Sequence, residues 1–460
     1  MSPSPPSRRP KGPAMENRAV QWLLLVLVTV APARAGELPL SLVFCLDSAM
    51  GANRDLVQAR QEVQALEGER IFVRARFMPS LDLVADYAAD RAALDSQVQD
   101  RLSSQLRFNQ RLFEFGPDAV QEVTLRDNLR RAVYAYEGEV YQVLAQVWER
   151  FHLILLQDRQ IAIRRESRRG FEEIFARQQA LKTEKLATED DVLSAELNVL
   201  REDQRINVLI REQFDNKMDL QRLIGQSIGV DIQLQGTVET VEQFALDQEE
   251  AVQLALGSSV QVALASERLD EQQRVVREQA WTYSPDINLH AGVENNRRRA
   301  QVKIDKEASA WGADLSSDLR LDDGAEPLAE GTRWFTRLEA RIPLFEGGAR
   351  IGQEARERAR LRQRRVGLED LRHRIDLQVR QAHLLMEEAL RQKEIQERAV
   401  VIARRRLQIN QKLKERGLVS DIFFEQQRDR FFDEQDQLFA NQANYISQQA
   451  KLRLLMGFFE

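Results

Sequence analysis

Apolar and polar residues alternate along four short segments of the chain, and each segment can run about 9 to 12 residues. Successive side chains of a β-strand point to opposite faces, so this period of two predicts strands with one apolar and one polar face. The segments pair into two β-hairpins, about 79–115 and about 285–346. Their alternating apolar residues are Leu81, Leu83, Ala85 and Tyr87; Leu102, Leu106, Phe108 and Leu112; Ile287, Leu289, Ala291 and Val293; and Trp334, Leu338, Ala340, Ile342 and Leu344.

A helical period follows each predicted hairpin. Apolar residues then recur in steps of four and three, which is the spacing of a coiled-coil stripe. No proline interrupts 118–284 or 344–460, so these regions can form long helices. We predict two long helical hairpins, 117–225 and 349–457. The stripes are Val140, Leu144, Val147, Phe151 and Ile154 in the first, and Ile375, Val379, Ala382, Met386 and Ala389 in the second.

The two halves of the chain are internal repeats. Leu112–Gly116, Lys185–Thr188 and Leu223–Gly225 recur 232 positions later as Leu344–Gly348, Gly417–Ser420 and Leu455–Gly457. Further upstream, Met78–Leu83 matches Ser284–Leu289 at an offset of 206. The second copy is therefore 26 residues longer between its two predicted strands. We predict that the polar stretch 297–331 holds these residues as an exposed loop.

Each repeat is thus predicted to contain a helix, a β-hairpin and a long helical hairpin. The first repeat covers 36–225 and the second 247–460, with helices at roughly 51–77 and 247–281 and a linker at 226–246. Residues 1–35 are predicted to be an export signal, since basic Arg18 precedes an apolar stretch and Ala33-Arg34-Ala35 ends it. About 13 apolar residues are too few for a membrane helix, which needs roughly 20. Met15 is a plausible alternative start.

Composition argues against several classes of protein. The 460 residues include one cysteine, Cys45, and four scattered histidines, and the formal net charge is −6. Cysteine-based metal clusters, disulfides and nucleic-acid binding are therefore not expected. The sequence contains no Gly-rich phosphate loop, no His-Glu-x-x-His motif and no nucleophile elbow. The sequence predicts no enzyme, no cofactor and no metal site.

Alternation alone also fits a half-buried sheet in water. The export signal and the paired hairpins favour a transmembrane β-barrel instead. Four strands cannot close a barrel, since outer-membrane barrels use about eight or more, and open edges are too costly in lipid. Several chains must therefore pool their strands, and three chains would give twelve.

These motifs, repeated in the same order, resemble the TolC-type outer-membrane channels of Gram-negative bacteria over about 41–457. The residues that carry the resemblance are the strand openings at Pro79 and Pro285, the Leu-Phe-Glu-x-Gly strand ends, the Gly417–Ser420 turn and the terminal Leu455–Gly457. The resemblance implies a mostly α-helical homotrimer with a 12-stranded barrel in outer-membrane lipid and a helical tunnel in the periplasm. It also implies the exit duct of a tripartite efflux pump or a type I secretion system, with a periplasmic adaptor protein joining the duct to an inner-membrane pump.

The resemblance places adaptor contacts at the tips of the helical hairpins. By position these are Lys185, Leu186, Ala187 and Thr188, with Gly417, Leu418, Val419 and Ser420. The plainer interpretation is that both segments are tight helix turns. Asp190, Asp191 and Asp421 are possible pore-entrance acids, although solvated charge is the default interpretation. The second tip departs from some relatives, because Phe423 and Gln426 stand where those carry acids.

An alternative function remains open at this stage. A periplasmic coiled-coil scaffold or adaptor protein without a pore could also combine β-modules with helical hairpins. The duplicated hairpin with one shared helical offset favours the channel. The sequence does not identify the cargo or the pump.

Overall fold

A computed structural model describes residues 40–75, 77–91, 98–115, 120–229, 231–236, 246–279, 285–295, 297–307, 310–321, 331–342 and 347–457. The predicted export signal, 1–35, lies outside these residues, as does part of the predicted linker. Among the described helices, none is both long and apolar enough to cross a membrane.

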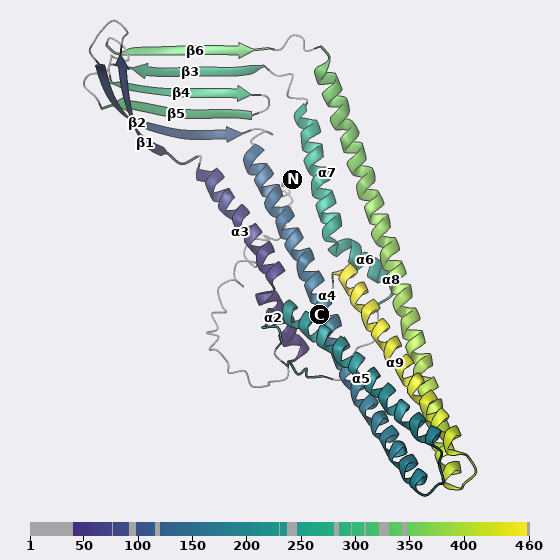
Figure 1. The fold of residues 1–460 in the computed structure, drawn as a ribbon. Helices are drawn as coiled ribbons and strands as arrows, with labels where there is room; N and C mark the ends of the chain where they lie inside the picture. The colour runs from purple at the N-terminus through teal and green to yellow at the C-terminus, as the bar shows by residue number, and fades with distance from the viewer. Residues whose placement is uncertain are drawn as a thin grey trace, which may run out of the picture. The chain divides into compact units, whose positions relative to one another are not determined.

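The element order repeats, which confirms the predicted two-repeat fold (Figure 1). The long helices of the second repeat follow those of the first at the predicted offset of 232 residues, to within three residues at each end. The first repeat comprises α2 (Leu42–Ala52), α3 (Arg54–Ala75), β1 (Ser80–Arg91), β2 (Val98–Phe115), α4 (Val120–Thr183) and α5 (Glu189–Leu223). The second comprises α6 (Gln248–Ser258), α7 (Val260–Gln279), β3 (Asp286–Glu294), β4 (Arg298–Glu307), β5 (Ala310–Arg320), β6 (Arg333–Arg341), α8 (Ala349–Glu415) and α9 (Asp421–Met456).

Two helices open each repeat, where one was predicted at roughly 51–77 and one at roughly 247–281. In the first repeat α2 lies almost wholly ahead of the predicted range, and in the second α6 and α7 divide it. The breaks fall at Asn53 and Ser259, which are 206 residues apart and thus equivalent in the duplication. The Asn53 Oδ1 accepts hydrogen bonds from the backbone N–H groups of Asp55 and Leu56 at 2.9 and 3.1 Å. Ser259 Oγ accepts one from Val262 at 3.3 Å. Each polar side chain therefore caps the second helix of its pair.

All six strands form one antiparallel sheet in the order β1-β2-β5-β4-β3-β6. The prediction of a loop over 297–331 is wrong, because most of this stretch forms β4 and β5. The alternation there is weak, because Ala300, Val302 and Ile304 are the only apolar residues of β4 and their neighbours are Gln301 or charged residues. Backbone pairing with β2 and β3 satisfies the main-chain groups that a loop would leave to water.

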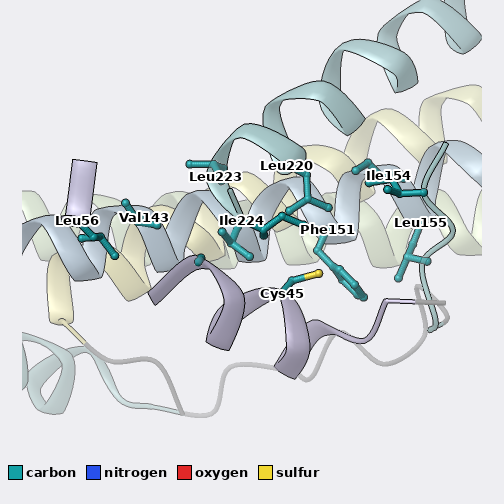
Figure 2. Close-up of a cluster of buried hydrophobic side chains, with 12 residues drawn as sticks. Cys45, Leu56, Val143, Phe151, Ile154, Leu155, Leu220, Leu223 and Ile224 are labelled. Carbon is teal, nitrogen blue, oxygen red and sulfur yellow. The ribbon is translucent and has the colours of Figure 1, made fainter. Parts of the chain in front are cut away.

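The helices are arranged as the stripes predict. Near the sheet the packing order is α3–α4–α7–α8, and further along the long helices it becomes α5–α4–α9–α8. The predicted stripe residues Val147, Ile154 and Val379 are fully buried. Figure 2 shows one core, in which the Cys45 side chain of α2 lies among Phe151, Leu220 and Ile224 from α4 and the end of α5. Burial raises the pKa of the Cys45 thiol to about 12.

Candidate functional site

The two long helical hairpins turn through equivalent tips. In the first, Lys185 adopts a positive φ of 61°, and in the second Gly417 has a φ of 75°. The next N–H then bonds a carbonyl five residues earlier, from Leu186 to Leu181 at 2.8 Å and from Leu418 to Leu413 at 2.9 Å. This is the hydrogen-bond pattern of a Schellman helix end. The turn geometry therefore explains why glycine stands at position 417, and it makes Lys185 the strained member of the pair.

Each tip exposes one large apolar side chain directly after the turn. Leu186 is 72% exposed and Leu418 is 68% exposed. Ala187 and Val419 beside them are half-buried. Thr188 and Ser420 then cap the return helices, since their hydroxyl oxygens accept from the N–H groups three residues on. Each capped turn therefore presents one exposed leucine to its surroundings.

Asp191 has a structural part in the first tip. Its carboxylate accepts hydrogen bonds from the backbone N–H of Thr188 at 2.9 Å and from its hydroxyl at 2.6 Å, which completes a capping box. The hydrogen bond from the Thr188 hydroxyl, and to a lesser extent the one from the Thr188 N–H, hold the pKa of Asp191 below its usual value. Asp190 is exposed. Asp421 is the first residue of α9, and its side chain lies outside the described residues. A pore-entrance role for the three acids stays a prediction.

A buried ionic cluster joins three helices on the sheet side of the tips. Arg164 of α4 and Glu202 of α5 are each 2% exposed, and the guanidinium Nη1 donates to the carboxylate at 2.9 Å. The Arg164 Nε also donates to Asp436 of α9 at 3.2 Å. Closer to the tips, the Arg428 guanidinium of α9 lies 4.1 Å from the centre of the Phe171 ring of α4. The two hairpins are therefore held together along α4 and α9.

Sequence reasoning did not identify Arg164. The available signal was its position, since it comes three residues after buried Ile161 on the face that packs inward. Because α4 also carries arginines on its exposed faces, residue type alone does not distinguish the buried Arg164 from them.

The outer helices α5 and α8 carry apolar stripes that none of the described helices of the chain covers. Because α5 and α8 stand at the two ends of the order α5–α4–α9–α8, these stripes are free to pack against another subunit. Steps of three, four and seven, with one of ten on α5 and one of eleven on α8, keep these residues near one face of each helix and predict coiled-coil contacts. The exposed residues are Leu193, Leu197, Leu200, Ile210 and Phe214 on α5, and Leu377, Leu384, Ile395, Ile402 and Ile409 on α8.

The sheet also ends in two unpartnered edges, β1 and β6. One face of these edge strands is apolar and open, with Leu83 and Leu338 each 68% exposed and Trp334 77% exposed. The opposite face carries ion pairs between strands, such as Arg107–Asp318 at 3.2 Å and Arg111–Asp314 at 3.1 Å. Apolar residues outside and charges inside are typical of a wall between lipid and water.

A sequence model described as outer membrane efflux protein matches residues 45–226 and 251–458. The chain belongs to the outer membrane efflux protein family. Membership confirms the predicted class, an outer-membrane exit duct, and does not favour a scaffold without a pore. No curated protein matches the sequence significantly.

Solved structures of outer-membrane channels share the fold. The CmeC channel of Campylobacter jejuni has a TM-score of 0.70 at 12% identity, covering 90% of this chain and 85% of that one. The open state of the MtrE channel of Neisseria gonorrhoeae has a TM-score of 0.70 at 13% identity, covering 90% and 88%. VceC of Vibrio cholerae has a TM-score of 0.66 at 14% identity, covering 90% and 96%.

Proposed function

We propose that three copies of this chain form a passive outer-membrane channel, exported by the signal at residues 1–35. The observation that carries this proposal is that both layers of the chain end in two complementary unpartnered edges. In the helical layer, the stripe of α8 would pack against the stripe of α5 of the next copy. In the sheet, β6 would pair with β1 of the next copy. A ring closes both layers at once.

The charged face of the sheet would line the channel. Ion pairs such as Arg107–Asp318 hold lumenal charges in place without a deep binding pocket. Such a lining lets hydrated solutes pass down their gradient, so energy must come from a separate pump. We propose that the tips at Lys185–Thr188 and Gly417–Ser420 contact a periplasmic adaptor that recruits this pump. The exposed Leu186 and Leu418 support this assignment.

A test of the trimer begins with membrane fractionation and gel electrophoresis before and after boiling. We expect a heat-sensitive trimer in the outer membrane that conducts ions in planar bilayers. Ile402→Glu on the α8 stripe should abolish the trimer, because a carboxylate would enter an apolar helix seam. Gln408→Glu is the matched control, since Gln408 is exposed about a third of a turn away. A monodisperse monomer that needs no detergent would refute the proposal.

The tips require a separate test in cells. A photo-crosslinking amino acid at Leu186 or Leu418 should give a product with an exported protein that mass spectrometry identifies as an efflux adaptor. The same amino acid at Gln408 should not give that product. Products only between copies of this chain, or with unrelated proteins, would contradict adaptor docking at the tips.

A further inference from the structure

We infer that the β4–β5 hairpin is part of the membrane wall, so that each chain supplies six strands and three chains close an 18-stranded barrel. This inference rests on the proposed trimeric channel and raises the number of strands around its pore from twelve to eighteen. Twelve strands follow from four per chain, whereas the described sheet holds six.

The apolar face of the sheet continues across β4 and β5. Residues directly opposite each other on neighbouring antiparallel strands share a face. The register therefore links the apolar residues of the edge strands through the inserted hairpin without a change of side. The pairs are Leu83 with Leu106, Leu106 with Leu319, Leu315 with Val302, Val302 with Ala291, Ile304 with Leu289, and Leu289 with Leu338.

The charged face is equally continuous. Arg107 and Arg111 of β2 pair with Asp318 and Asp314 of β5. At the other side of the hairpin, Glu294 of β3 accepts from Arg299 of β4 at 2.7 Å and from Arg333 of β6. A hairpin projecting into water would need neither a one-sided apolar face nor ion pairs in register with both neighbours. Membership of the wall explains both features.

The limits of the apolar run on β4 fit a bilayer. Arg298 and Lys306 lie on the same face as Ala300, Val302 and Ile304, eight residues apart. At about 3.3 Å per residue they are about 26 Å apart along the strand, or about 20 Å along the membrane normal at a tilt of about 40°. Arg298 is exposed and can extend to the head groups. The Lys306 Nζ instead donates to the carbonyl of Pro285, just before β3, at 2.7 Å. Both charges therefore lie at the edges of an apolar band of about 25 Å.

Aromatic residues mark the same two levels on the neighbouring strands. Tyr87 lies near the C-terminal end of β1 and Trp334 near the N-terminal end of β6, which is the side of the sheet away from the long helices, and both are exposed. Trp311 and Phe113 lie at the opposite, helix-side ends of β5 and β2, where a bulge brings Phe113 opposite Ala313 on the apolar face. Two aromatic girdles flanking an apolar band are a feature of outer-membrane barrels.

The dimensions of the two layers then agree. Next to the sheet, each chain presents the four helices α3, α4, α7 and α8, and twelve helices about 9 Å apart form a ring of about 108 Å circumference. Strands about 4.8 Å apart and tilted by about 40° take about 6.3 Å each. Eighteen strands therefore give about 113 Å, and twelve give only about 75 Å. Six strands per chain continue the helical ring without narrowing.

The even strand number also permits closure. Strand direction alternates along the six-stranded order, so β1 and β6 run antiparallel to each other. Head-to-tail pairing of β6 with the β1 of the next copy therefore continues the antiparallel pattern around the ring.

Lipid quenching of single-cysteine variants tests the inference. In a Cys45→Ala background, Val302→Cys and Leu315→Cys place a thiol on the apolar face, and Gln301→Cys and Ser316→Cys are their polar-face neighbours. Each variant would carry a bimane label in liposomes that contain brominated phosphatidylcholine. Leu83→Cys and Leu338→Cys on the edge strands report whether the sheet enters lipid at all.

We expect the labels at 302 and 315 to lose emission to the same extent as those at 83 and 338, with no loss at 301 and 316. Quenching at 83 and 338 without quenching at 302 and 315 would overturn the six-strand inference and leave the channel standing. No quenching at 83 and 338 would overturn the proposed channel itself. A reconstruction of the trimer should show a barrel about 36 Å across its backbone, and about 24 Å would mean twelve strands.

Discussion

The buried pair Arg164–Glu202 offers a quantitative test of how the two helical hairpins are joined. Glu202→Leu removes the carboxylate that accepts from the Arg164 Nη1 at 2.9 Å. The arginine keeps Asp436 but remains almost inaccessible to water. Breaking a buried ion pair from one side costs about 3–5 kcal/mol. Because Asp436 still neutralises part of the charge, we expect a loss at the lower end, about 3 kcal/mol per chain.

The double variant Arg164→Met with Glu202→Leu separates the buried charge from the loss of packing. Apolar residues of similar volume often replace a buried pair at little or no cost. Asp436 would then lose the guanidinium but keep the Gln160 amide, which donates to it at 3.3 Å, and its side chain is about one-third exposed and can be hydrated. We therefore expect the double variant to be close to the wild type in stability. Glu212→Leu, exposed on α5 and away from its apolar stripe, is the single-site control and should be neutral.

Thermal unfolding of the purified protein in detergent, followed by far-ultraviolet circular dichroism, measures these differences. With an unfolding entropy of about 2.1 cal/mol/K per residue over about 400 ordered residues, 3 kcal/mol lowers Tm by about 3–4 °C. Equal losses in the single and double variants would show that packing and not the unpaired guanidinium sets the cost. No loss in Glu202→Leu would mean that water reaches Arg164, and the proposed junction would be refuted.

Three further predictions concern single sites. Gly417→Ala should destabilise the second tip by about 1–2 kcal/mol, because it forces an L-residue into positive φ. Lys185→Gly should stabilise the first tip by up to about 1 kcal/mol, because it removes an L-residue from positive φ. The two variants should therefore shift Tm in opposite directions, and equal shifts would contradict this. Burial, more than the nearby Arg453, lowers the pKa of His152 in the folded protein. Below about pH 6.5 the unfolded chain therefore binds more protons than the folded one, and the free energy of unfolding should decrease as the pH is lowered. His152→Gln should reduce this slope in Tm measured between about pH 7 and 5, and an unchanged slope would exclude His152 as its source. Cys45 should resist maleimide in the native protein and react after unfolding in guanidinium, since its buried thiol has a pKa of about 12; native labelling would refute its burial.

The long helices could be placed from the sequence because coiled-coil packing leaves little freedom. An insertion in one arm of a helical hairpin shifts its stripe off the partner unless the other arm compensates. The two copies therefore keep one offset from the strand ends through the tips at Lys185 and Gly417 to the end of α9. The breaks at Asn53 and Ser259 were missed because both helices lack proline there, and a single polar side chain forms each cap.

The inserted hairpin could not be predicted because its strand signal is short. A transmembrane strand shows only alternate apolar residues, and in β4 these are Ala300, Val302 and Ile304 between charged ends. In β5 the apolar face includes Ser317 opposite Ala300. Only pairing with β2 and β3 shows that these residues belong to a larger apolar face. The part played by Asp191 was similarly hidden, since its capping bonds depend on the backbone at Thr188.

In the proposed ring, the position of the hairpin in the sheet would let a chain gain wall strands without losing the edges that meet other copies. β4 and β5 lie between β2 and β3, so the edge strands β1 and β6 keep their places. Two added strands also preserve the alternation of direction, whereas a single added strand would make β1 and β6 parallel and prevent antiparallel closure. An insertion at either edge would instead have replaced the surface that meets the next copy. Among simple additions, an internal hairpin would therefore widen the proposed wall while leaving both edges that are proposed to meet other copies unchanged.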